Sequence, residues 1–328
     1  MTHQSNQGKT WSIVLAGGEG TRVGSFVERW LGRPRPKQFC TFVGTRSLLQ
    51  HTVDRAACLT PAAQSILVIA KSHRQEAMTQ LDGRGVGTVL FQPTNRDTGA
   101  GVFLPLTYVR ARDPQATVII YPSDHFVYPE VRFLATVRNV VLVTERLHDR
   151  IVLLGVAPDR LELDYGWILP GERLTDSGAS PVQAVRAFLE KPTAREADEA
   201  LATHGLWNTM VMVAKVETLW NLGQQCFPEL VERFERLGRA IGTSEEAQTL
   251  ESIYQTMPNK NFSSDLLQRV PDRVAVTELT NALWSDWGRP ERIAEALRRT
   301  GLTPAFPLDA LGSPFAPIHQ GSPVAVKM

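Results

Sequence analysis

The chain has 328 residues, of which 43% are hydrophobic and 21% are charged, and its formal net charge at pH 7 is +1. This composition is typical of a soluble globular protein with a sizeable core, and it lacks the global basic field that nucleic-acid binding would favour. No apolar run is long enough to cross a bilayer, so the sequence predicts no membrane span.

The N-terminal segment and the cysteines indicate a reducing compartment. Residues 1–11 (MTHQSNQGKTW) lack the apolar region of a secretory signal and are predicted to be a short disordered lead-in. Cys40, Cys58 and Cys226 are odd in number and share no metal-ligand spacing, so they are interpreted as ordinary thiols. We therefore expect a cytoplasmic protein without a zinc site.

The most informative stretch runs from residue 12 to residue 39 and begins as a buried strand over residues 12–16. A glycine-rich loop, residues 17–22 (GGEGTR), follows the strand directly. Glycines in this place let backbone N–H groups approach an anion. Arg22 is suited to bidentate phosphate binding, and Lys37 adds a compact point charge. The stretch therefore indicates a site for a polyphosphorylated ligand.

Two common glycine loops do not fit this stretch. A dinucleotide-binding fingerprint would need a glycine where Val23 stands. A Walker loop ending at residues 8–10 would need its first glycine where His3 stands, and no strand precedes it. The remaining alternative is an ordinary tight turn between a strand and a helix.

The segments that follow alternate between apolar strands and amphipathic helices. The predicted elements are a helix over residues 47–59, strands over 66–70 and 89–91, a helix over 100–112 and a strand over 118–121. Such alternation predicts an open, largely parallel sheet, in which ligands bind beyond the carboxyl ends of the strands. We therefore expect the loops 17–22, 92–99 and 122–125 to converge on one crevice.

The second half of the chain continues the α/β pattern. Its predicted elements are strands over residues 151–156, 182–189 and 206–213, a helical layer over 216–254 and a helix over 290–299. Residues 301–328 are rich in proline and glycine and are predicted to form an arm that packs on the body or on a second subunit. The expected organisation is one domain over residues 1–300 followed by this arm, and a homodimer is left open.

Seven short motifs resemble those of the sugar-phosphate nucleotidyltransferases, which make nucleotide-sugars. They are LAGGEGTR with RPKQF (15–22 and 35–39), QPTNRDTGAG (92–101), PSDH (122–125), DYGWI (164–168), EKP (190–192), WNTM (207–210) and SDWG (285–288). The resemblance covers residues 11–300 and lies closest to the mannose-1-phosphate guanylyltransferases. It implies a three-layer, Rossmann-like (GT-A-like) fold with a mixed, mostly parallel central sheet.

The resemblance also implies an activity and a role for individual residues. A sugar 1-phosphate oxygen would attack the α-phosphorus of a nucleoside triphosphate, with GTP and mannose 1-phosphate favoured, and release pyrophosphate. The implied catalytic residues are Arg22 and Lys37, and the implied Mg²⁺ ligands are Asp124 and Asp286. The nucleotide would be bound by Leu15, Ala16, Gly17, Gly18, Gly20, Thr21, Gln92, Arg96, Thr98 and Ser123. The sugar phosphate would be bound by Gly166, Glu190, Lys191 and Asn208, with Asp265 as a weaker candidate.

No catalytic base is expected, because a phosphate monoester has a second pKa of about 6 and is already ionised at neutral pH. Catalysis would rest on in-line positioning and charge stabilisation. Several of these residues have structural alternatives. Asp124 could be a turn or helix-capping aspartate, the loop 92–99 an ordinary loop with Thr98 as a cap, and Glu190–Lys191 a solvated pair.

The sequence departs from the family pattern at several positions. Asp97 stands where asparagine is usual, Gly99–Ala100 where Ala-Pro is usual, Asp164 where glycine is usual and Met210 where glycine is usual. These changes leave open another pair of substrates, such as glucose 1-phosphate with dTTP or UTP. They also leave open a non-catalytic regulatory homologue that binds a nucleotide-sugar. A glycosyltransferase would need an Asp-x-Asp motif, which residues 123–125 do not provide. Met210 could instead be a core methionine.

Overall fold

The structure is a computed structural model that describes residues 10–175 and 181–311. Strand β1 (Thr10–Ala16) lies inside a nine-stranded sheet. Ile13 packs into a hydrophobic cluster on one face of this sheet, and the next residue, Val14, packs into a cluster on the other face. Successive strand residues point to opposite faces, so an unbroken apolar run is what a strand buried on both sides requires.

The other strands of the sheet are β2 (Ser65–Ala70), β3 (Thr88–Gln92), β4 (Thr117–Pro122), β6 (Ile151–Val156), β7 (Trp167–Thr175), β8 (Val182–Leu189), β9 (Leu206–Lys215) and β10 (Val274–Glu278). Their order is β3-β2-β1-β4-β9-β6-β10-β8-β7. Pairing is parallel from β3 to β4 and between β6 and β10. Strand β9 is antiparallel to β4 and β6, and β8 is antiparallel to β10 and β7. The predicted mixed, largely parallel sheet is confirmed.

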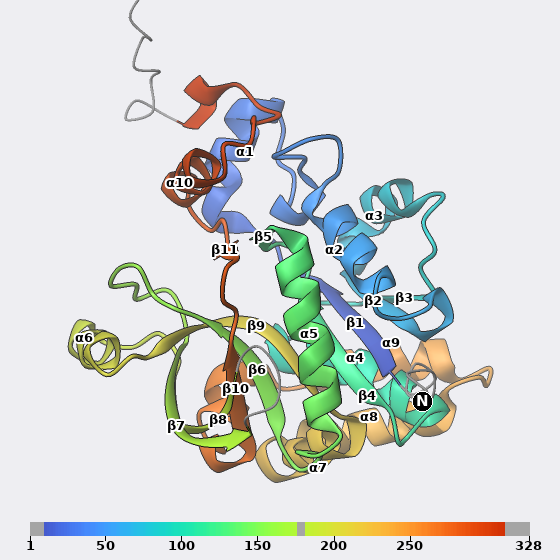
Figure 1. Ribbon diagram of the computed structural model, residues 1–328. Coiled ribbons are helices and arrows are strands. Elements are labelled where there is room, and N and C mark those ends of the chain that lie inside the picture. Colours follow the sequence, from blue (N-terminus) through green and yellow to red (C-terminus); the bar gives the residue numbers. More distant parts are fainter. Residues whose placement is uncertain (1–9, 176–180, 312–328) are drawn as a thin grey trace, which may run out of the picture.

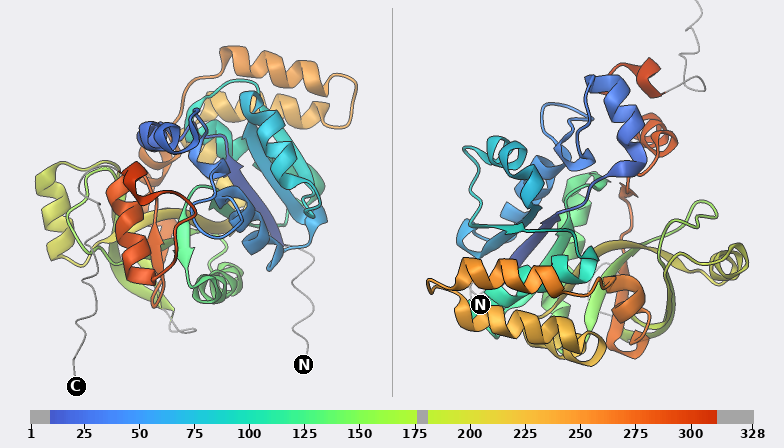
Figure 2. Two further views of the ribbon diagram at one scale, coloured as in Figure 1. Left: turned by 90° about the horizontal axis from the view of Figure 1, so that it is seen from above. Right: turned by 180° about the vertical axis from the view of Figure 1, so that it is seen from behind.

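Helices cover both faces of the sheet. On one face lie α4 (Asp97–Arg112), α7 (Val216–Cys226), α8 (Pro228–Ala240) and α9 (Glu246–Thr256), which are in front when the molecule is seen from behind (Figure 2). On the other face lie α2 (Leu48–Ala57), α3 (Arg74–Leu81), α5 (Glu130–Thr144) and α6 (Ala194–Ala202), and α5 crosses the front of the sheet in Figure 1. The sheet and the helices on its two faces therefore form three layers.

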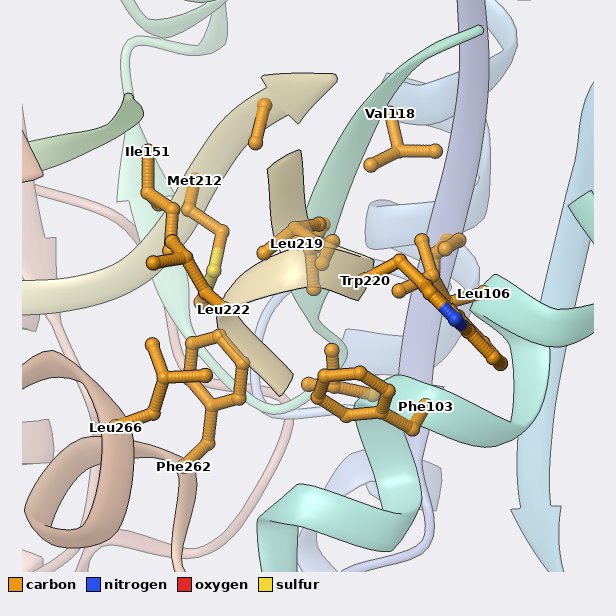
Figure 3. Close-up of a cluster of buried hydrophobic side chains, with 14 of the residues drawn as sticks. Phe103, Leu106, Val118, Ile151, Met212, Leu219, Trp220, Leu222, Phe262 and Leu266 are labelled. Carbon is orange, nitrogen blue, oxygen red and sulfur yellow. The ribbon is translucent and has the colours of Figure 1, made fainter. Parts of the chain in front are cut away.

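The core on the α4 side shows how the layers interlock. Phe103 of α4 and Trp220 of α7 lie 6.1 Å apart between ring centroids, and they belong to the same buried cluster as Val118 of β4 and Met212 of β9 (Figure 3). All four side chains are buried. Dense packing of large side chains between sheet and helices is the main source of stability in such folds.

A third cluster joins the two ends of the described chain. Helices α1 (Gly24–Leu31) and α10 (Pro290–Thr300) pack together through it, next to the small antiparallel pair β5 (Phe126–Tyr128) and β11 (Leu283–Ser285). Phe306 lies edge-on to Phe26, with ring centroids 5.2 Å apart. Residues 301–311 therefore pack on the body, whereas 312–328 and the lead-in 1–9 lie outside the described residues. The domain boundary at residue 300 stays a prediction.

Most predicted elements occur with small changes in their bounds. Helix α4 begins at Asp97, three residues before the predicted start, because Asn95 and Asp97 side chains accept the first N–H groups of its opening turn. The predicted helical layer divides into α7, α8 and α9, with Pro228 opening α8. Helices α1, α3, α5 and α6 and strands β5, β7, β10 and β11 were not predicted.

Short turns complete the described chain. They are 3₁₀ turns at Thr21–Val23, Lys37–Phe39, Ala62–Gln64, Lys71–His73, Pro271–Arg273 and Leu308–Leu311, and a π turn at Ser263–Leu267. Within the described residues, every helix is too short or too polar to cross a membrane.

Candidate active site

The loops after β1, β3 and β4 meet at one cavity, as the parallel direction of the strands predicted. The cavity has a volume of about 630 Å³. Its lining comprises Leu15, Gly17, Gly18, Val68, Gln92, Asn95, Asp97, Thr98, Gly101, Pro122, Asp124, His125, Met210 and Asn259. Six of the predicted site residues are in this lining, which is large enough for a nucleotide-sized ligand.

The glycine-rich loop is held close to the segment that carries Lys37. The side-chain amide of Gln38 donates to the Gly18 carbonyl at 2.7 Å, which fixes the start of the loop. Gly20 has a φ of 61°, in the left-handed region, and a Cβ there would fall 2.8 Å from the backbone nitrogen of Lys37. Only glycine meets both requirements without strain, so the loop conformation explains the residue.

Lys37 is buried next to Asp124, which lines the cavity. Its side chain is 3% exposed, and its ammonium lies 2.9 Å from Asp124 Oδ2 and donates to the backbone carbonyl of Asp286. Burial opposes ionisation of the Asp124 carboxyl, but the nearby Lys37 and His125 outweigh it, so the pKa of Asp124 lies below its usual range. One buried cation thus contacts both aspartates that the family resemblance implies as metal ligands.

Asp286 is enclosed by donors. Its Oδ1 accepts hydrogen bonds from the Tyr165 hydroxyl at 2.6 Å, Arg292 Nη1 at 2.8 Å and the Gly288 N–H at 2.9 Å. Its Oδ2 pairs with Arg22 Nη2 at 2.9 Å. Burial alone would raise the pKa of Asp286, but the surrounding cations and the Tyr165 hydroxyl hold it far below its usual value. The carboxylate is therefore ionised at neutral pH.

The two arginines on Asp286 differ in exposure. The Arg22 side chain is 53% exposed, so it can offer its remaining N–H groups to an incoming phosphate. The Arg292 side chain is only 7% exposed and also pairs with Glu162. Arg292 was missed by sequence reasoning because it lies on α10 outside every recognised motif. Tyr165 was missed as well, although it lies within the DYGWI motif.

Two of the predicted nucleotide-binding residues, Gln92 and Arg96, have different surroundings. Gln92 faces the glycine loop, since a Cβ on Gly17 would fall 2.4 Å from its Oε1, and its amide donates to the Tyr254 hydroxyl at 3.2 Å. Arg96 instead donates to the backbone carbonyls of Tyr254 and Gln255 at 2.9 and 3.1 Å. Its guanidinium holds the end of α9, and Arg96 is not among the residues that line the described cavity.

The predicted sugar-binding residues lie beside β9. Asn208 donates its backbone N–H to the Gly166 carbonyl at 2.8 Å, and a Cβ on Gly166 would fall 3.0 Å from Glu190 Oε2. Burial raises the pKa of Glu190. Lys191 follows with a φ of 47° and an exposed side chain. The structure thus brings Gly166, Glu190 and Asn208 together, with Lys191 at the outer edge.

Three further predicted residues lie in the backbone frame of the site. The Ser123 N–H donates to the Leu15 carbonyl at 3.0 Å, which ties the loop after β4 to β1. Thr98 lies in the first turn of α4. Its hydroxyl accepts the Phe262 N–H at 2.8 Å, which ties this turn to the segment that contains Phe262. Asp265 accepts the Asn261 N–H at 2.9 Å, which gives this weaker candidate a local structural role.

The donor set agrees with a magnesium site that substrate phosphates complete. Among the described residues, no three histidine, cysteine, aspartate or glutamate side chains gather closely enough to hold a metal by themselves. Mg²⁺ is commonly held by one or two carboxylates together with phosphate oxygens. Asp124 fits, because its side chain is 33% exposed and lines the cavity. Asp286 could reach a cation only through Oδ2, next to Arg22.

Comparison with known proteins places this site in a family. Residues 11–301 match the sequence model of the family described as nucleotidyl transferase. The chain is 24% identical over 284 residues to an Escherichia coli mannose-1-phosphate guanylyltransferase. This match covers 84% of the chain and 59% of that relative. It is 26% identical over 294 residues to the xanthan biosynthesis protein XanB of Xanthomonas campestris pv. campestris (strain B100), covering 88% and 60%. The chain spans about three fifths of the length of these relatives.

A solved structure shares the fold. A Thermus thermophilus protein described as a mannose-1-phosphate geranyltransferase superposes with a TM-score of 0.73 and 27% sequence identity. The superposition covers 89% of this chain and 79% of that protein. The likeness therefore extends over most of this chain.

Proposed function

The chain belongs to the nucleotidyl transferase family, and on that premise we propose that it transfers a nucleotidyl group from a nucleoside triphosphate to a sugar 1-phosphate. The favoured pair is GTP with mannose 1-phosphate, which would give GDP-mannose and pyrophosphate. The observation that carries the proposal is the buried Lys37 ammonium between Asp124 and the Asp286 carbonyl, beside the glycine-rich loop. A cation fixed there suits a reaction in which negative charge passes between phosphates.

The residues around Lys37 have complementary tasks in this proposal. The N–H groups of the loop 17–22 and the exposed guanidinium of Arg22 would bind the triphosphate. Lys37 would lie near the phosphorus under attack, and Asp124, with Asp286 as the second candidate, would hold Mg²⁺. When bound, Mg²⁺ supplies positive charge that neutralises the phosphate oxygens. The rigid placement of Lys37 means that little reorganisation is needed during the reaction.

The sugar 1-phosphate would lie between β9 and the start of β7. Glu190 and Asn208 offer an acceptor and an amide to sugar hydroxyls, and the Gly166 backbone allows close approach. Lys191 is proposed to reach the sugar phosphate from the rim. The phosphate oxygen is ionised near pH 7, so positioning rather than deprotonation would limit its attack.

The preference for guanine and mannose is supported by the names of the relatives and not by a hydrogen-bond pattern. Leu15, Gln92 and Thr98 line the cavity on the side where a base would lie. Gln92 carries both donor and acceptor groups, which could pair with more than one base. Glucose 1-phosphate with dTTP or UTP therefore remains the alternative pair for the test to distinguish.

The test is release of pyrophosphate in the presence of Mg²⁺. Five nucleoside triphosphates (GTP, dTTP, UTP, ATP and CTP) are each combined with mannose 1-phosphate and with glucose 1-phosphate. Lys37→Ala should abolish most of the turnover, whereas Lys71→Ala, at an exposed lysine paired with Glu251, should retain it. Turnover with GTP and mannose 1-phosphate supports the full proposal. Absence of release with every pair, from folded protein that binds a nucleotide-sugar, would instead identify a regulatory homologue.

A further inference from the structure

Met210 occupies an unusual backbone position at the edge of the site. Its φ is 58°, in the left-handed region that glycine normally occupies. It also lies in an irregular part of β9, because Asn208 pairs with Gly155 while Met212 pairs with Leu153, so β9 has two extra residues over this interval. Bulges of this kind re-aim a side chain and occur next to active sites.

The bulge is held by local hydrogen bonds. The Thr209 hydroxyl donates to the Leu154 carbonyl at 2.7 Å, and the Val211 N–H donates to the Thr209 hydroxyl at 3.2 Å. Met212, two residues beyond Met210, is fully buried in the core. Met210 by contrast is only partly buried and lines the cavity together with Gln92 and Asp124. The strained backbone thus presents a large apolar side chain to the ligand space.

Met210 also contacts Asn208, which is expected to bind the sugar, and the nearby Ser263. Asn208 accepts the Met210 N–H with Oδ1 at 3.0 Å and directs Nδ2 to the Met210 sulfur at 3.2 Å. The Ser263 hydroxyl lies 3.4 Å from the same sulfur, and it also bonds to Glu190. The thioether therefore contacts two polar residues beside the sugar subsite, Asn208 and Ser263, and Ser263 connects it to Glu190.

We propose that Met210 limits the size of the sugar that this site accepts. The inference rests on the proposed function and concerns the substrate class of the same site. The Met210 side chain has as many heavy atoms as an acetamido group, and it fills the space between Asn208 and Ser263. A hexose 1-phosphate with free hydroxyls fits beside it, whereas an N-acetylhexosamine 1-phosphate would place its acetamido group where the thioether lies.

The experiment compares kcat/KM for mannose 1-phosphate, glucose 1-phosphate and N-acetylglucosamine 1-phosphate, each with the triphosphate that the unaltered protein uses best. In Met210→Gly the preference for the better unsubstituted sugar over the N-acetylated sugar should fall by about tenfold or more, the scale at which a pocket senses added groups. Met210→Leu retains the bulk and should preserve the preference. Met212→Leu is the matched control in the core.

The Met210→Gly variant is expected to fold, because glycine adopts the left-handed backbone conformation at position 210 without strain. Met210→Ala removes most of the side chain by a second route, and urea unfolding of each variant checks its integrity. An unchanged preference in both Met210→Gly and Met210→Ala would overturn the inference and leave the proposed function standing. So would an unaltered protein that already prefers the N-acetylated sugar. Absence of turnover with every pair would overturn both.

Discussion

Replacement of Lys37 by methionine tests whether the Lys37–Asp124 pair holds the site together. The substitution keeps most of the side-chain volume and removes the ammonium. It leaves the Asp124 carboxylate, which is 33% exposed, without its cation at 2.9 Å. It also leaves the Asp286 carbonyl without its donor. We expect a large loss of stability, because a buried charge without a partner is costly.

The magnitude follows from the geometry. Two unit charges 2.9 Å apart attract by about 6 kcal/mol at an effective dielectric constant of about 20. Most of this attraction is offset by the loss of hydration of the two groups, and breaking buried pairs costs roughly 3–5 kcal/mol. Water can reach the exposed third of Asp124, so we expect a loss of about 3 kcal/mol in the free energy of unfolding.

The assay is urea unfolding followed by tryptophan fluorescence, since the chain contains seven tryptophans. Asp124→Asn and the double variant Lys37→Met/Asp124→Asn complete a double-mutant cycle. The double variant should be more stable than Lys37→Met alone, because it no longer contains the unpaired carboxylate. A Lys37→Met protein within about 0.5 kcal/mol of the unaltered one, destabilised further by Asp124→Asn, would refute the reasoning.

Three further predictions concern other parts of the chain. Burial opposes ionisation of Asp54, but hydrogen bonds from two arginines hold its pKa below the usual 3.8. Its contribution is therefore complete above pH 3.8 and lost as the pH falls, so the difference in unfolding free energy between the unaltered protein and Asp54→Asn should shrink in acid. Gly20→Ala should weaken nucleotide binding by about tenfold, measured by calorimetry, because its Cβ displaces Lys37. Phe306→Ala should cost about 3 kcal/mol in urea unfolding, because its ring is buried against Phe26.

Each of these predictions has an outcome that contradicts it. A difference between the unaltered protein and Asp54→Asn that stays constant with pH would show that the ion pairs contribute nothing. Nucleotide affinity that Gly20→Ala leaves intact would mean that the loop tolerates a side chain. A Phe306→Ala protein that loses less than about 1 kcal/mol would show that residues 301–311 are not part of the core.

The sequence predicted some strands with the observed bounds. Strand β6 is a continuous apolar segment that is buried throughout. Strand β8 alternates loosely between buried and more exposed residues, and Pro192 follows it closely. Helix α5 was missed although Phe133, Val137 and Val140 recur at helical spacing on its buried face. The position of β9 between β4 and β6 could not be predicted, because strand pairing depends on contacts between residues far apart in the chain.

The site was predictable where it follows from strand direction. Parallel strands bring their carboxyl ends to one edge, and the loops at residues 17–22, 92–99 and 122–125 accordingly share one cavity. The use of each polar group within the site was not predictable. Arg96 binds carbonyls at the end of α9, and Tyr165 donates to Asp286 across 121 positions of sequence. Such partners are determined by packing and leave no local pattern.

The hydrogen bonds of Asp286 imply which cation is free to move when substrate arrives. Oδ1 is held by Arg292, Tyr165 and the Gly288 N–H, all from buried groups, so the carboxylate stays satisfied without help from Oδ2. Among the residues that the structure describes, Arg22 is the one that pairs with Oδ2, and its side chain is 53% exposed. Pairs with such an exposed partner contribute little to stability. In the proposed function, a triphosphate would therefore draw Arg22 away at small cost, and the same movement would free Oδ2 to contact a cation.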